Sequence, residues 1–162
     1  MDVNALIQQV DARRGLPLEL FLLVSRLTPL VNVDLLIQDE DGRTLLTWRD
    51  DEFFGTGWHL PGGVIRFKER ASDRILACAL EELGVAVTHA PEPEKVVESV
   101  RASETRGHLV SLLYRCRLIV APDENRRAIS DPPRIGQWRW HRQCPPDLVE
   151  VQAPYARFFT QP

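Results

Sequence analysis

The chain has 162 residues, which suits one domain with a core large enough to fold unaided. Its hydrophobic share of 44% and charged share of 27% are typical of a globular protein. A net charge of -3 argues against general nucleic-acid binding, and no apolar run is long enough to span a bilayer. The three cysteines lack the spacing of a metal motif, and the N-terminus lacks the pattern of a signal peptide. Together these features predict reduced thiols and a cytoplasmic location.

Two short helices are predicted at the N-terminus, over Val3 to Val10 and over Leu18 to Leu27, with Gly15 and Pro17 between them. We expect residues 1–27 to form a helical segment that precedes the main domain, residues 28–162. This segment either covers one edge of the core or forms part of a homodimer contact. The sequence leaves both arrangements open.

The main domain begins with two predicted strands, Leu30 to Ile37 and Thr44 to Trp48, joined by a hairpin turn. Asp34 lies within the first of these apolar strands, so its carboxylate needs a partner if it is buried. Arg49 at the end of the hairpin is one candidate. The two residues form either a structural ion pair or part of a ligand site. Residues 50–57 are expected to be a polar loop at the rim of that site.

The stretch from Trp58 to Val85 organises the rest of the chain. It starts with the tight turn Pro61-Gly62-Gly63 and continues into a predicted helix over residues 70–83, which Gly84 ends. Three glutamates of this stretch precede the helix or lie off its apolar face: Glu69, Glu81 and Glu82. A glycine turn and several carboxylates would supply the oxygen ligands that Mg²⁺ prefers.

Beyond this stretch the pattern predicts more strands and a closing helix. The strands are expected over Val85 to Thr88, Lys95 to Val100, His108 to Val120 and Gln137 to His141, and the helix over Val149 to Phe159. Because side chains alternate along a strand, Trp138 and Trp140 lie on the same side of the last strand. They either stack on a base or pack against the terminal helix.

The spacing of the central stretch resembles the Nudix hydrolase signature G-x5-E-x7-R-E-U-x-E-E-x-G-U, in which U is a bulky aliphatic residue. The box spans residues 63–85, and the residues in register are Gly63, Glu69, Glu81, Glu82, Gly84 and Val85. Ala77 and Cys78 stand where the family has Arg-Glu. A thiol suits soft metals and not Mg²⁺, and Arg74, one turn before Cys78, competes for the same space.

The altered Arg-Glu pair resembles the branch of GDP-mannose mannosyl hydrolases. The preceding segment is also similar to that branch, in Thr28-Pro29-Leu30-Val31, Leu45-Leu46 and Gly57-Trp58. This resemblance implies an α/β fold, a Nudix-type α/β/α sandwich with a mixed sheet. It also implies Mg²⁺-dependent (or Mn²⁺-dependent) hydrolysis of a nucleoside diphosphate sugar, which releases the sugar and a nucleoside diphosphate. The alternatives are an ordinary Nudix pyrophosphohydrolase and a non-catalytic nucleotide-binding module.

Motif position carries the family's roles onto this chain. The implied metal ligands are Gly63, Glu69 and Glu82; the implied catalytic residues are Arg49, Glu81 and Glu82; the implied substrate contacts are Asp34, Arg49 and Trp58. Arg49 would neutralise the diphosphate. The branch has a catalytic histidine in the loop before its last strand, and residues 130–136 contain none. Candidate substitutes for that base are His59, His108 and Asp131.

Overall fold

The computed structural model describes residue 5 and residues 8–159. Half of the predicted helix over Val3 to Val10 lies outside these residues. The first complete helix is α2 (Leu18–Leu27), which follows Pro17 as predicted. Across the described part of the chain, no helix combines the length and apolar character needed to cross a membrane.

The larger of two sheets is mixed, as predicted. Its strands are β1 (Leu30–Ile37), β4 (Gly62–Val64), β5 (Val87–His89), β6 (Lys95–Val100) and β7 (His108–Leu118). Strand β1 lies at the centre, parallel to β7 on one side and antiparallel to β4 on the other. Strands β5 and β6 both pair antiparallel with β7. The β1–β4 pairing places the glycine turn directly beside Asp34.

The smaller sheet is antiparallel, with β2 (Thr44–Asp51) between β3 (Gly55–His59) and β8 (Trp138–His141). The expected loop over residues 50–57 is wrong, because β2 and β3 form one hairpin through most of this range. The Asp51 carboxylate accepts hydrogen bonds from the backbone N–H groups of Phe53 and Phe54 and so closes the turn. This turn directs Phe54 towards the site.

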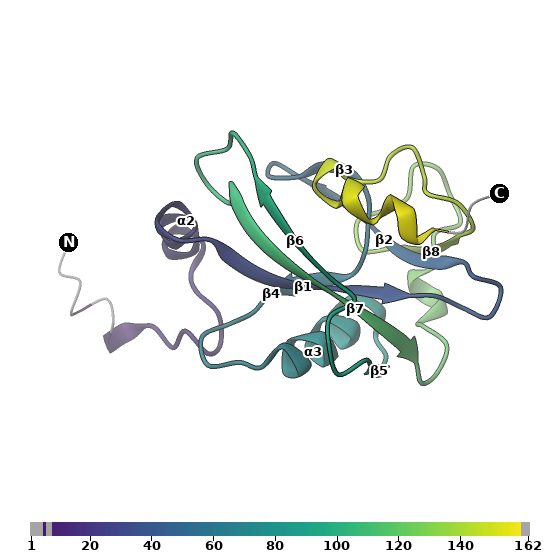
Figure 1. Ribbon diagram of the computed structural model, residues 1–162, viewed down its shortest axis with the longest axis horizontal. Coiled ribbons are helices and arrows are strands. Elements are labelled where there is room, and N and C mark those ends of the chain that lie inside the picture. The colour runs from purple at the N-terminus through teal and green to yellow at the C-terminus, as the bar shows by residue number, and fades with distance from the viewer. Residues whose placement is uncertain (1–4, 6–7, 160–162) are drawn as a thin grey trace.

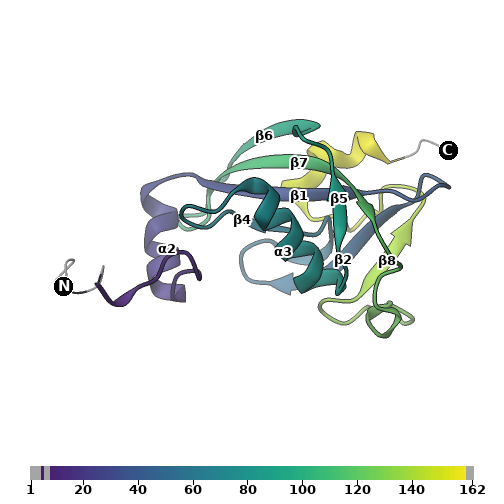
Figure 2. The ribbon, with the colours of Figure 1, turned by 90° about the horizontal axis from the view of Figure 1, so that it is seen from below.

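Helix α3 (Ala71–Leu83) covers one face of the larger sheet, as Figures 1 and 2 show. Its apolar face packs against the side chains of β1 that point to this side, including Val33 and Leu35. The helix ends at Gly84, which has a left-handed backbone (φ 71°), so the predicted stop is confirmed. The last turn of α3 thereby brings Glu82 beside β2 and the glycine turn.

The 3-10 segment η2 (Glu150–Phe158) lies on the opposite face of the larger sheet, where Figure 1 shows it in yellow. A closing α-helix was expected here, but Pro154 lacks the N–H that a regular helix needs at that point. Tyr155 packs with Leu36 in a second core cluster. Because side chains alternate along a strand, Asp34 points to the same face as Leu36 and therefore meets η2.

The tryptophans of β8 pack on the α3 side of the core and not against η2. Trp138 is 1% exposed, and its indole N–H donates to the backbone carbonyl of Asp123 over 2.8 Å. That segment is followed by the short 3-10 turn η1 (Glu124–Arg126). Trp140 is partly buried against the same core cluster. Packing therefore accounts for both rings.

Candidate active site

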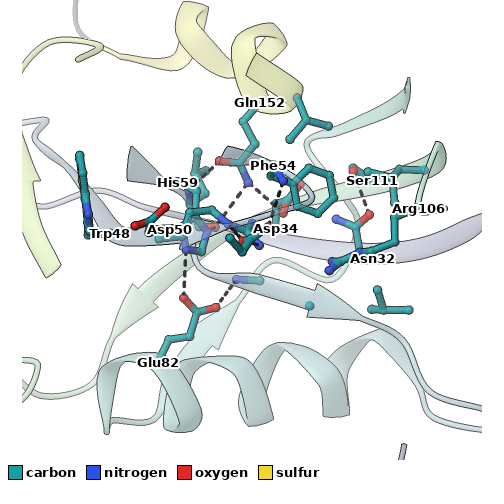
Figure 3. Close-up of a pocket in the computed structure, with 18 of the residues that line it drawn as sticks. Asn32, Asp34, Trp48, Asp50, Phe54, His59, Glu82, Arg106, Ser111 and Gln152 are labelled. Carbon is teal, nitrogen blue, oxygen red and sulfur yellow. Dashed lines mark hydrogen bonds and ion pairs between the residues drawn. The ribbon is translucent and has the colours of Figure 1, made fainter. Parts of the chain in front are cut away.

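A pocket of about 390 Å³ lies where β1, β2, the glycine turn, α3 and η2 converge. Figure 3 shows Glu82 entering it from α3 and Gln152 from η2 on the opposite side. Of the residues predicted to form the site, the pocket contains Asp34, Arg49, Gly63 and Glu82. Its lining also contains residues that carried no sequence signal, among them Asn32, Trp48, Phe54, Arg106, Ser111 and Gln152.

Asp34 is 5% exposed and is held from the η2 side. The Tyr155 hydroxyl donates to its Oδ2 over 2.7 Å, and Gln152 Nε2 donates to its Oδ1 over 3.2 Å. Burial raises the pKa of Asp34 to about 6, although these hydrogen bonds favour the charged form. Because Arg49 pairs with Asp51 instead, the alternative of a structural ion pair between Asp34 and Arg49 is wrong, and both residues line the pocket.

Arg49 lies on the pocket wall with its guanidinium held on two sides. Its Nε donates to Asp51 Oδ2 over 2.7 Å, and its Cζ lies 4.8 Å from the centroid of the Phe54 ring. The ion pair and the ring contact fix the orientation of the guanidinium without enclosing it, because Arg49 still lines the pocket. This geometry suits a cation that receives an anionic ligand.

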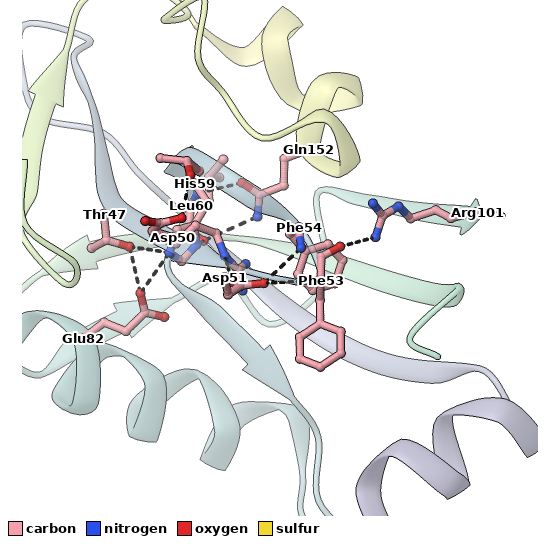
Figure 4. A network of polar contacts seen from close by, with 12 residues as sticks. Thr47, Asp50, Asp51, Phe53, Phe54, His59, Leu60, Glu82, Arg101 and Gln152 are labelled. Atoms are coloured by element: carbon pink, nitrogen blue, oxygen red, sulfur yellow. Dashed lines mark hydrogen bonds and ion pairs between the residues drawn. The ribbon is translucent and has the colours of Figure 1, made fainter. Parts of the chain in front are cut away.

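Glu82 belongs to a partly buried network that Figure 4 shows from close by. Its Oε1 accepts from the Gly62 N–H over 2.7 Å, and its Oε2 accepts from the Thr47 hydroxyl over 2.8 Å. Burial raises the pKa of Glu82 to about 7. A carboxyl group with this pKa can hold or release a proton near neutral pH.

His59 lines the pocket as a neutral ring. Its Nδ1 lies 2.8 Å from the backbone oxygen of Leu60, which can only accept, so Nδ1 carries the proton. Its Nε2 lies 3.0 Å from Thr47 Oγ1. Burial lowers the pKa of His59 to about 4. The Thr47 hydroxyl has one hydrogen, which goes either to His59 Nε2 or to Glu82, so this contact does not by itself occupy Nε2. The low pKa makes the ring a weak base and so weakens the case for His59 as the catalytic base.

The centre of the box is occupied by an internal cation. Arg74 is 4% exposed, and its Nε and Nη2 donate to Glu69 over 2.9 and 2.7 Å. Its Nη1 also lies 3.8 Å from Glu81 Oε2. Cys78 is 2% exposed, and burial raises the pKa of its thiol to about 12. The Arg74 guanidinium thus pairs closely with Glu69 and more loosely with Glu81.

The residues present do not fit the Mg²⁺ site that the motif implies. Glu69, an expected ligand, is tied to Arg74, and Cys78 is a neutral thiol where the family has a carboxylate. Among the residues that the structure describes, no three His, Cys, Asp or Glu side chains are grouped to hold a metal. We therefore assign no chemical step to a metal.

Several predicted residues lie away from the pocket. Trp58 is 3% exposed and packs edge-on against Trp48, whose ring lies on the pocket wall in its place. The Glu81 side chain is 58% exposed beside Arg74 and does not line the pocket. Two of the three substitute bases, His108 and Asp131, do not line the pocket, and they contact Glu98 and Arg139 instead.

A family comparison decides the identity of the fold, because the NUDIX domain family matches residues 28–157. The chain belongs to the NUDIX domain family. Among solved structures, the MutT NUDIX hydrolase from Burkholderia pseudomallei is 25% identical, with a TM-score of 0.66. That alignment covers 82% of this chain and 99% of the hydrolase. The predicted NUDIX fold with a mixed sheet is confirmed.

Two further relatives differ in what their names say. A structure described as a possible asymmetric diadenosine tetraphosphate hydrolase from Jonesia denitrificans is 25% identical, with a TM-score of 0.60. That alignment covers 78% of this chain and 89% of that one. The low-salt glycan biosynthesis protein Agl8 from Haloferax volcanii is 45% identical over 60 residues, 37% of this chain. The aligned segment spans only 38% of Agl8.

The state of the thiol in this NUDIX box can be tested by alkylation. We expect iodoacetamide to label Cys144, which is partly exposed, and to spare Cys78 and Cys116 in the folded protein. A pKa of about 12 leaves each of the two buried thiols about a thousandfold less ionised than an ordinary thiol of pKa 9. Peptide mass spectrometry identifies the labelled residue, and labelling in urea provides the three-site control. Rapid labelling of Cys78 in the folded protein would show that the centre of the box is open to ligands.

Proposed function

We propose that this NUDIX protein hydrolyses a nucleoside diphosphate sugar, GDP-mannose or a related compound, to the sugar and a nucleoside diphosphate. The proposal depends on one observation: a single pocket contains both positively charged and acidic side chains. The guanidinium groups of Arg49 and Arg106 line it together with the carboxyl groups of Asp34 and Glu82. Its volume of about 390 Å³ lies in the range of small-molecule sites.

Attack at the anomeric carbon suits this set of residues. Cleavage there passes through a transition state of oxocarbenium character, which depends on the leaving group more than on a strong nucleophile. Negative charge develops on the departing diphosphate, and the fixed guanidinium of Arg49 stabilises it electrostatically. The carboxyl group of Asp34 lines the same pocket and can hold a sugar hydroxyl.

The proton of the attacking water also has an acceptor in the pocket. Glu82, when ionised, takes this proton on a carboxylate oxygen, since each oxygen keeps a lone pair beyond the bond it already accepts. The Gly62 N–H and the Thr47 hydroxyl hold the carboxylate in one orientation. Glu82 therefore takes the role that the family branch gives to a histidine.

The names of two relatives support the proposal, one for the sugar and the other for the hydrolysis. The name of Agl8 refers to glycan biosynthesis, and the segment it shares with this chain is 45% identical. The name of the Burkholderia pseudomallei protein refers to hydrolysis, and its alignment covers 82% of this chain. Together they favour a hydrolase whose substrate carries a sugar.

The deciding experiment is a screen of nucleotide sugars with both products identified by chromatography. We expect free sugar and a nucleoside diphosphate. A sugar phosphate and a nucleoside monophosphate would instead indicate the ordinary pyrophosphohydrolase, and nucleotide binding without turnover would indicate a non-catalytic module. Parallel reactions with EDTA and with Mg²⁺ test the metal dependence that the motif resemblance implied.

A further inference from the structure

Three guanidinium groups surround one aromatic ring at the edge of the pocket. The Cζ atoms of Arg49, Arg101 and Arg106 lie 4.8, 5.0 and 4.6 Å from the centroid of Phe54. Figure 3 shows Phe54 and Arg106 side by side, with Ser111 close to them. Stacking on an aromatic face favours each cation, but three like charges in one place repel one another.

This cluster, Arg49, Arg101, Arg106 and Phe54, lacks matching negative charge. Asp51 pairs with Arg49, whereas Arg101 donates to the neutral backbone oxygen of Phe53 over 2.9 Å. Within the described part of the chain, neither Arg101 nor Arg106 forms an ion pair with a carboxylate. The Nε of Arg106 is buried and has no hydrogen-bond partner among those residues. Three guanidinium groups beside one paired carboxylate leave the cluster with excess positive charge, so a bound anion would stabilise it.

The backbone holds Arg106 in a conformation that it would not adopt freely. Its φ is 53°, in the left-handed region that residues with a side chain rarely occupy. The next residue must be glycine, because a Cβ at Gly107 would clash with the backbone oxygen of Ser103. The backbone N–H of Arg106 donates over 3.0 Å to the hydroxyl of Ser25, which in turn donates to the backbone oxygen of Leu22 within α2. Helix α2 thus fixes the position of Arg106.

We propose that Arg49 and Arg106 form the binding site for the diphosphate group, with Arg106 as a direct ligand and Ser25 as its positioning residue. Arg74 fills the centre of the box, so the box offers no metal cation to the diphosphate. The two arginines supply the positive charge instead. This anion site rests on the proposed function, since the diphosphate is part of the proposed substrate. A fixed guanidinium binds phosphate oxygens through paired N–H groups, and its prior ordering lowers the cost of binding.

Inorganic pyrophosphate tests the anion site separately from any hydrolysis. We expect calorimetric titration of the intact protein in EDTA to show pyrophosphate binding, weakened about tenfold in Arg106→Ala, the loss of one charge-assisted contact. The pyrophosphate affinity of Arg106→Lys should fall between those of the wild type and Arg106→Ala, because a lysine keeps the charge and loses the paired donors. The matched control is Arg115→Ala, since Arg115 lies on β7 beside Glu94 and outside the pocket.

Ser25→Ala supplies a second test that keeps Arg106 itself. Because it removes the hydrogen bond to the Arg106 backbone, this substitution should weaken pyrophosphate binding several-fold. Thermal unfolding should show that the variant is still folded. Unchanged pyrophosphate affinity in folded Arg106→Ala or Arg106→Lys would overturn the anion site, and so would binding that requires Mg²⁺. Arg106-dependent pyrophosphate binding without turnover of any nucleotide sugar would refute the proposed hydrolysis and leave the anion site supported.

Discussion

Replacing Arg49 with alanine is expected to lower the turnover of the preferred nucleotide sugar by about tenfold to a hundredfold, through the loss of one charge on the leaving diphosphate. Arg49 is the cation of the pocket that is fixed both by an ion pair, with Asp51, and by contact with Phe54. Its effect should therefore fall mainly on kcat, since the diphosphate gains charge as the bond to the sugar breaks. Steady-state kinetics with Arg115→Ala as the matched control measures the difference.

The comparison with His59 separates two mechanisms. Because its low pKa makes the His59 ring a weak base, His59→Ala should reduce turnover less than Arg49→Ala does. Each variant must first be shown to fold, since Arg49 pairs with Asp51 and His59 is buried. Loss of activity in folded His59→Ala, with near wild-type activity in Arg49→Ala, would establish a histidine base and contradict the proposed mechanism.

The stability of the protein should depend on pH through Asp34. The pKa of this carboxyl is about 6 in the folded protein against 3.8 in the unfolded chain, because burial disfavours its charge. The folded state therefore binds more protons between these values, and the contribution of Asp34 to stability is lost as the pH rises from about 4 to about 6. The difference of two pKa units corresponds to about 3 kcal/mol in the free energy of unfolding.

Asp34→Asn isolates this contribution from those of other groups. Relative to the wild type, the variant should gain up to about 3 kcal/mol between pH 4 and pH 7, because asparagine carries no charge in the folded state. Tyr155 can keep its hydrogen bond to the amide, since a hydroxyl both donates and accepts. Urea unfolding at several pH values measures the difference. A constant difference between the two proteins over this range would show that Asp34 keeps its ordinary pKa.

The parts of the fold that local pattern controls could be predicted from the sequence. The spacing from Gly63 to Val85 identified the family, and Gly84 marked the end of α3 because a left-handed residue there favours glycine. The mixed sheet followed from that family resemblance. The hairpin of β2 and β3 was missed, because its turn depends on hydrogen bonds to Asp51 that polar composition does not reveal.

The candidate site depends on contacts between residues far apart in the chain. Arg49, fifteen positions away, was one candidate partner for Asp34, but Asp34 bonds instead to Tyr155, 121 positions away. Arg106 likewise belongs to no motif, and its position is set by a serine in a helix before the family domain. The motif located Glu69 and Glu82 correctly in sequence, yet the engagement of Glu69 by Arg74 depends on burial at the box.

The hydrogen bond between Ser25 and Arg106 has a consequence for where this domain can be cut. The family match begins at residue 28, so a protein shortened to that position would keep every matched residue and every strand. It would nevertheless lose the hydroxyl that holds the left-handed backbone at Arg106. The family match therefore begins after a residue that positions Arg106, and Ser25 must be kept if the pocket is to keep its shape.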